Sequence, residues 1–117
     1  MDNFTRILLL TDADIGYFDS RMRLDPPLRQ QRDREALSQA LKSGVIDALV
    51  SDHTPVKDDA KALPFAEAES GATGLELLLP LTLKWAAETK IPLSQALAKI
   101  TQSPAKILGI DTGHLTP

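Results

Sequence analysis

Residues 45–56 read Val-Ile-Asp-Ala-Leu-Val-Ser-Asp-His-Thr-Pro-Val, an apolar run that ends in an acid and a histidine. The run 45–50 is short, rich in branched residues and apolar on both alternating faces, which predicts a parallel strand covered on both sides. In α/β proteins the polar residue after such a strand lies at the carboxyl end of the sheet, where active sites form. Asp52 and His53 are therefore either part of a site or a local cap, since aspartate readily accepts hydrogen bonds from the next backbone N–H groups.

Outward from this stretch, apolar runs alternate with loops and helical patterns. A second buried strand is predicted at 6–10, parallel to the first, because the helix between them is long enough to supply the crossover. Long loops are expected at 13–29 and 52–73. Within the second loop, the acidic pair Asp58-Asp59 and the flanking lysines Lys57 and Lys61 are expected to form a solvated surface.

The helical patterns have recognisable ends. Four helices are predicted, at 30–42, 74–89, 91–101 and 103–109. Gly44 should end the first helix, and in the second Pro80 should kink or relax the first turns while Trp85 lies in the core. The last helix should begin with Ser103 as N-cap and Pro104 in the first position, and end at Gly109.

Two strands are too few to close a sheet. A βα-barrel needs eight strands and roughly 250 residues, so these 117 residues are expected to be the end of something larger. Unpaired strand edges and unburied apolar faces would follow. The apolar faces of the two strands carry Leu8, Leu10, Ile46 and Ala48. We expect these faces to drive association with a second copy, with the rest of the barrel or with a partner subunit.

Composition excludes several classes of protein. Hydrophobic residues make up 43% of the chain, enough for one domain with its own core. The net charge of −3 gives no general nucleic-acid footprint, and no apolar stretch is long enough to span a membrane. The sequence has no cysteine, which excludes disulfides and thiolate metal sites and fits a cytoplasmic protein.

Several linked motifs resemble one family. These are Asp-Pro-Pro-Leu-Arg at 25–29, Asp-Arg-Glu-Ala-Leu at 33–37, Ser-Asp-His-Thr-Pro at 51–55, Gly-Ala-Thr-Gly-Leu-Glu at 71–76 and Ser-Pro-Ala-Lys-Ile-Leu-Gly at 103–109. Their order and spacing are similar to the C-terminal part of class I dihydroorotases, in the amidohydrolase superfamily. The resemblance covers about residues 8–110.

The resemblance implies a fold and a chemistry. The family fold is a metal-dependent (β/α)8 TIM barrel, of which residues 1–117 would form the last third in an α/β arrangement. The position of Asp52 implies a ligand of a catalytic zinc ion that also shuttles a proton during hydrolysis of a cyclic amide, dihydroorotate, in de novo pyrimidine biosynthesis. A metal-bound water with a pKa near 7 and a nearby carboxylate base suit that reaction. Gly71 matches the glycine of the family's substrate loop.

Departures from the family pattern are as informative. Val56 stands at the position of a substrate-binding histidine, and Asp25 at the position of a substrate-binding asparagine, where its charge should repel an anionic substrate. Arg6 falls in the family's Pro-His-His stretch, which includes a metal-binding histidine. The family's His-x-His pair and bridging lysine lie upstream of the matched region, and the sequence has two histidines, His53 and His114.

These departures predict a chain that is catalytically silent by itself and binds no zinc, with His53 pointing away from any metal. Either the chain is a fragment of a longer dihydroorotase-like protein, or its parent is a degenerate member of the family. Such pseudo-dihydroorotases are structural partners of aspartate transcarbamoylase and share an Asp-Ile-Gly-x-Phe-Asp stretch, which is present at 14–19. The residues Val56 and Asp25 favour the second explanation.

Overall fold

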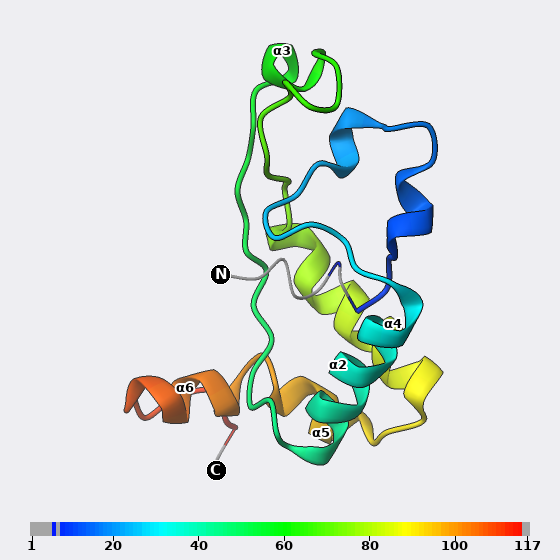
Figure 1. Cartoon of the computed structure of the whole chain (residues 1–117). Helices are drawn as coiled ribbons and strands as arrows, with labels where there is room; N and C mark the ends of the chain where they lie inside the picture. Colours follow the sequence, from blue (N-terminus) through cyan, green and yellow to red (C-terminus); the bar gives the residue numbers. More distant parts are fainter. Residues whose placement is uncertain (1–5, 7, 116–117) are drawn as a thin grey trace.

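Helices and long connecting segments make up the described chain. The computed structural model describes residue 6 and residues 8–115 (Figure 1). In chain order the elements are the 3-10 turns η1 (Asp12–Ile15) and η2 (Ser20–Met22), the helices α2 (Gln31–Ser43) and α3 (Asp58–Lys61), the 3-10 turn η3 (Leu75–Leu77), and the helices α4 (Leu78–Thr89), α5 (Leu93–Ala98) and α6 (Gln102–Leu108).

Neither predicted strand forms in the described residues, so the expected parallel pair and the α/β arrangement are wrong for this part of the chain. Ile7, in the first predicted strand, lies outside the described residues. The N–H groups of Leu9 and Leu10 donate to the carbonyl of Arg6 at 3.0 and 2.8 Å, which makes a helical turn. In the second predicted strand, residues 45–50, the N–H of Leu49 donates to the carbonyl of Lys99 at 2.9 Å. A strand needs a neighbouring strand to pair its backbone.

Lys99 holds the second of these segments against the end of α5. Its side chain is 8% exposed, and Nζ donates to the carbonyl of Ile46 at 2.8 Å. Together with the Leu49 bond, this anchors residues 46–49 at both ends. The apolar run thus reaches the core along a helix end instead of within a sheet.

The helix α2 confirms the predicted helix at 30–42 to within one residue. It ends where Gly44 takes the left-handed conformation, with φ of +82°, a backbone state that glycine reaches without steric cost. Leu41 is fully buried on the inner face. Across the contact with α4, Nε1 of Trp85 donates to Oγ of Ser38 at 2.8 Å.

The predicted helix at 74–89 forms in two parts, η3 and then α4. Pro80 is the third residue of α4, where a backbone N–H would have no intrahelical acceptor, so the proline fits without breaking the helix. The tighter 3-10 turn before it agrees with the expected relaxation of the first turns. Trp85 is 1% exposed, which confirms its predicted place in the core.

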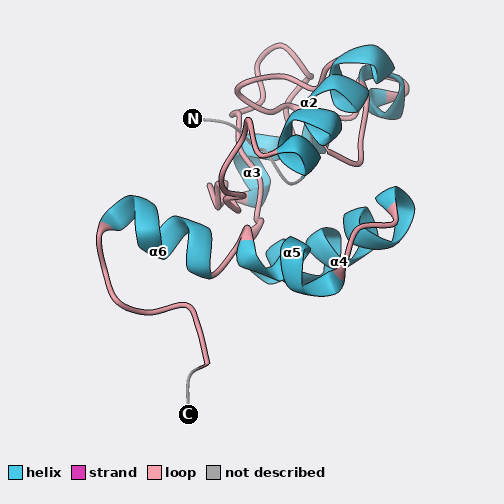
Figure 2. Ribbon diagram, turned by 90° about the horizontal axis from the view of Figure 1, so that it is seen from below, coloured by secondary structure: helices cyan, strands magenta, loops and turns pink. Residues whose placement is uncertain are grey.

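The start of the last helix differs from the prediction. Thr101, not Ser103, is the N-cap residue of α6, and Pro104 is in its third position instead of its first. The Thr101 hydroxyl donates back to the carbonyl of Leu97 at 2.8 Å, so it extends the preceding turn. Gly109, with φ of +69°, ends the helix as predicted. Viewed from below, α6 projects away from α2 and α4 (Figure 2).

One main core joins α2, α4 and α5. Its buried residues are Leu8, Leu41, Leu49, Trp85, Ala86, Ile91 and Ala96. The expectation that Leu8, Leu10, Ile46 and Ala48 lie on unburied faces is therefore wrong: Leu8 is buried, and the other three are half-buried. The exposed apolar side chains lie elsewhere, among them Val45, Leu75, Leu79, Leu93, Ile107 and Ile110.

The molecule is elongated. Its radius of gyration is 15.4 Å and its extents are 52 × 28 × 20 Å, whereas a compact chain of this length would have a radius of gyration of roughly 13 Å. Within the described residues, no helix combines the length and apolar character needed to cross a membrane.

Candidate functional site

Two extended segments, 51–56 and 71–74, run side by side between α3 and η3. The N–H of Thr54 donates to the carbonyl of Ala72 at 3.0 Å. The segments approach so closely that a Cβ added at Gly71 would lie 2.7 Å from the carbonyl oxygen of Thr54, and one at Gly74 would lie 2.5 Å from that of Ser51. Both glycines are therefore required by backbone contact, and Gly71 also has φ of +135°.

Asp52 lies at the bend between the apolar run and this paired region. It is half-buried and has φ of +45°, a left-handed conformation that is uncommon for residues other than glycine. Its carbonyl accepts a hydrogen bond from the Thr54 hydroxyl at 3.3 Å. Aspartate tolerates such a conformation better than most residues, so a turn role accounts for the backbone. The role of the carboxylate as catalytic group and metal ligand stays a prediction.

His53 caps the turn η3. Its Nδ1 accepts hydrogen bonds from the N–H groups of Gly74 at 3.0 Å and Leu75 at 3.2 Å. A ring nitrogen that accepts carries no proton, so in this arrangement the ring proton is on Nε2. The histidine beside the predicted catalytic acid thus satisfies two N–H groups at the start of a helical segment.

Val56 and Gly71, two of the three predicted substrate-binding positions, lie together in one pocket of about 230 Å³. Asp25 and Asp52 are not among the described residues that line it. Asp25 is exposed and precedes a cis peptide bond to Pro26. The remaining lining residues are Arg6, Arg21, Asp58, Lys61, Ala72 and Thr73.

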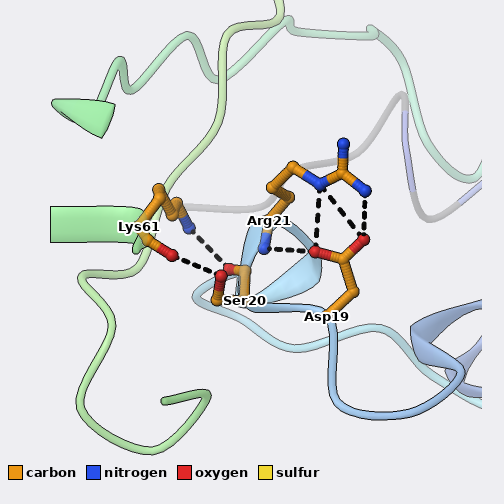
Figure 3. Close-up of polar contacts among 4 residues, drawn as sticks. All are labelled: Asp19, Ser20, Arg21 and Lys61. Carbon is orange, nitrogen blue, oxygen red and sulfur yellow. Dashed lines mark hydrogen bonds and ion pairs between the residues drawn. The ribbon is translucent and has the colours of Figure 1, made fainter. Parts of the chain in front are cut away.

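Sequence reasoning missed the cations of this pocket. Lys61, which was expected on a solvated surface, is partly buried at the end of α3. Its Nζ donates to the carbonyls of Ser20 at 3.2 Å and Arg23 at 3.0 Å, and the Ser20 hydroxyl donates to the Lys61 carbonyl (Figure 3). No local pattern signals this contact, because the partners are about forty positions apart in the sequence.

The loop that carries Ser20 is shaped by its neighbours Asp19 and Arg21. The Asp19 carboxylate accepts from the backbone N–H of Arg21 at 3.0 Å, and its Oδ2 lies 2.7 Å from Nη2 of the same arginine (Figure 3). These side-chain and backbone hydrogen bonds lower the pKa of Asp19, and the same side-chain bond raises the pKa of Arg21. The spacing Asp-x-Arg in the sequence could have predicted this pair.

Burial acts against the charges of the other two cations. It is the largest cause that lowers the pKa of Lys61, followed by the positive charge of Arg23. Burial also lowers the pKa of Arg6, whose Nη2 donates to the carbonyl of Thr73. The resemblance predicts a metal-binding histidine in the stretch that contains Arg6, and a guanidinium group is not a metal ligand.

The described residues do not supply a complete zinc site. A binuclear or single zinc centre needs several nitrogen and carboxylate donors that converge on the ion. Within residue 6 and residues 8–115, no group of three or more histidine, cysteine, aspartate or glutamate side chains is placed to hold a metal. Asp52 is one donor, and the Nδ1 of His53 is engaged by backbone N–H groups.

Comparison with known proteins gives consistent results at the level of sequence. Residues 6–117 match the amidohydrolase family. The chain is 43% identical over 108 residues to a dihydroorotase-like protein of Pseudomonas aeruginosa, and 44% identical over 108 residues to a dihydroorotase of Geobacter metallireducens. Each alignment covers 92% of this chain and 26% of the relative, so the chain spans about a quarter of the length of these relatives.

Solved structures of hydantoinases resemble this chain in backbone as well as in sequence. An L-hydantoinase (dihydropyrimidinase) from Arthrobacter aurescens superposes with a TM-score of 0.86 and 28% identity, and a D-hydantoinase with a TM-score of 0.83 and 27% identity. Each match covers 96% of this chain and 26% of the solved chain. Sequence and backbone thus point the same way, and the chain belongs to the amidohydrolase family, within which it is dihydroorotase-like.

Proposed function

We propose that residues 1–117 form the C-terminal part of the (β/α)8 barrel of a dihydroorotase-like protein of the cytoplasm. The observation that carries the proposal is the identity of 43–44% to a dihydroorotase-like protein and a dihydroorotase over 92% of the chain. The reaction of the complete protein would be hydrolysis of a cyclic amide, the interconversion of dihydroorotate and carbamoyl aspartate in pyrimidine biosynthesis.

In the complete barrel, Asp52 is the residue proposed to hold and return the proton. Its place two residues after the apolar run 45–50 supports this role, because the run has the composition of a strand and, if it forms one in the complete barrel, Asp52 faces the carboxyl end of the sheet. Zinc would supply an activated water when bound by a complete ligand set. The described residues do not fit such a set, and no step is assigned to zinc in this chain.

The chain by itself is proposed to be catalytically silent. The test is hydrolysis of dihydroorotate by the purified chain supplied with zinc, with the absorbance of the substrate as readout. Turnover should equal that of the buffer blank, and Val56→His should not restore it, because one added donor leaves the ligand set incomplete. Measurable turnover by the unmodified chain would overturn the proposal.

A second function, a non-catalytic structural partner of aspartate transcarbamoylase, is favoured by one observation. Arg6, which lies in the family's metal-binding stretch, donates to the carbonyl of Thr73 and so has a structural contact there. The substitutions at Val56 and Asp25 point in the same direction. If this function is correct, the chain should co-sediment with aspartate transcarbamoylase, and an Asp52→Asn variant should bind it equally well.

A further inference from the structure

An exposed aromatic cluster lies where the loop between η1 and η2 meets the loop after α3, at the end of the molecule that carries α3 (Figure 1). Tyr17 is fully exposed and Phe18 is 73% exposed. The ring of Phe18 packs edge-to-face on that of Phe65, with 5.7 Å between the ring centroids. We call these three residues the aromatic tip. Large aromatic side chains that face solvent together are typical of surfaces that bind a partner.

The two loops hold the aromatic tip in a defined conformation. Phe18 has φ of +59°, a left-handed state that is rare for a bulky side chain. The next N–H, that of Asp19, donates to the carbonyl of Ile15 at 3.2 Å and closes the turn. The hydroxyl of Ser20 donates to the Lys61 carbonyl, which ties one loop to the other (Figure 3). Because the rings are fixed before a partner binds, less conformational entropy is lost on binding.

The surface around the aromatic tip is acidic. Its exposed carboxylates, on residues 12–23 and 57–70, are those of Asp12, Asp14, Asp58, Asp59, Glu67 and Glu69. The basic side chains of the same residues are mostly engaged within the chain. Arg21 is paired with Asp19 at 2.7 Å. Arg23 and Lys61 donate to backbone carbonyls, which leaves Lys57 as the unengaged cation of these described loops.

Aromatic rings bordered by carboxylates fit an arginine better than any other side chain. A guanidinium group stacks on a ring, is attracted by the negative charge of the ring face and pairs with carboxylates in a planar geometry. The ammonium group of lysine has no planar face to stack. The negative potential around the tip attracts a basic segment and repels the phosphates of a nucleic acid.

We propose that the aromatic tip docks an arginine-bearing segment of a partner protein, with a guanidinium group against Tyr17 and Phe18 and the exposed carboxylates around it. This surface needs neither a metal nor a complete barrel, so it is independent of the proposed function.

The direct test uses the ring signals of Tyr17, which is the only tyrosine of the sequence. The full chain, isotope-labelled at tyrosine, is titrated at constant ionic strength with a short peptide of alternating arginine and glycine. The ring signals should shift in a saturable manner, and the matching lysine peptide should bind about threefold more weakly. Equal affinity for both peptides would mean charge attraction without stacking and would contradict the proposal. Ring signals that shift with protein concentration alone would show that a second copy covers the tip, and would also overturn it.

Three variants make the test specific, with the anisotropy of a fluorescent arginine peptide as readout. Tyr17→Ala removes an exposed ring, so the helix content should stay unchanged while the affinity falls about fivefold. Tyr17→Phe keeps the ring and should keep the affinity. Leu115→Ala is the matched control, because Leu115 is also fully exposed but lies past the end of α6. Equal weakening by Tyr17→Ala and Leu115→Ala would show that the aromatic tip is not the docking surface.

Discussion

At the scale of single residues, the contact between segments 51–56 and 71–74 depends on glycine. Gly71→Ala should destabilise the fold, because φ of +135° disfavours a side chain and the new Cβ would lie 2.7 Å from the carbonyl of Thr54. Backbone strain of this kind costs about 1–3 kcal/mol, and the clash adds to it. Urea unfolding, followed by circular dichroism, measures the loss.

Gly44 offers the control for that substitution. It also has a positive φ, +82°, but no atom lies within 4 Å of an added Cβ. Gly44→Ala should therefore cost only the left-handed conformation, roughly 1–2 kcal/mol. If both alanine variants lose the same stability, the close approach at Thr54 does not constrain the fold as described.

The Asp19–Arg21 pair predicts a dependence of stability on pH. The native pKa of Asp19 lies below its ordinary value, mainly because of the Arg21 side-chain hydrogen bond. The unfolded chain therefore binds more protons in acid, and the stabilisation is present above about pH 4 and lost as the pH falls through the native pKa. Asp19→Asn should lower the melting temperature at pH 7, and the difference from the parent should shrink below pH 4.

Asp47→Asn is the reference for this experiment. Asp47 is exposed, and no described residue forms a hydrogen bond or ion pair with its side chain. Its substitution should leave the melting temperature within experimental error of the parent across the same range of pH. A pH-independent difference between Asp19→Asn and the parent would mean that the pair with Arg21 does not titrate with folding.

At the scale of elements, a partly buried side-chain hydrogen bond joins α2 to α4, besides the exposed one from Lys42 to the Thr89 carbonyl. Ser38→Ala would leave the Nε1–H of Trp85, which is buried, without its acceptor at 2.8 Å. An unsatisfied buried donor costs about 1–3 kcal/mol. In the background Trp85→Phe, which has no such donor, the further substitution Ser38→Ala should cost much less. A double-mutant cycle by chemical unfolding measures this coupling, with Ser43→Ala, at the end of α2, as the control.

Elements that end through local interactions could be predicted from the sequence. The bounds of α2 and the stops at Gly44 and Gly109 depend on a left-handed residue that follows an apolar period. The sequence pattern predicts the start of α6 two residues late, because it does not show that the Thr101 hydroxyl donates to the carbonyl of Leu97.

Features that depend on distant partners could not be predicted. The runs 6–10 and 45–50 have the composition of strands, but a strand exists only against a neighbour, and in the described chain Leu49 is bonded to Lys99 instead. The pocket is a similar case. Val56 and Gly71 are predicted through the family pattern. Arg6 comes from a remote position, and Lys61 is fixed in the pocket by the carbonyls of Ser20 and Arg23, about forty positions away.

At the scale of the whole molecule, the exposed apolar side chains bear on assembly. Val45, Leu75, Leu93, Ile107 and Ile110 are each more than half exposed, and full burial of such a side chain contributes roughly 1.5–3 kcal/mol. Several together rival the ~5–15 kcal/mol stability of an entire domain. The proposal that these residues are part of a larger barrel accounts for this surface, because the rest of the barrel or a partner subunit would cover it.

The most direct test of this account is the mass of the purified chain in solution at micromolar concentration, without added partners, by sedimentation equilibrium. Self-association is expected, with an average mass above the 12.7 kDa of one chain that rises with concentration. Paired substitutions of exposed residues, Ile107→Lys with Ile110→Lys, should lower that mass. A clean monomer of 12.7 kDa with a single cooperative melt would show that these residues close their own core, and would contradict the account.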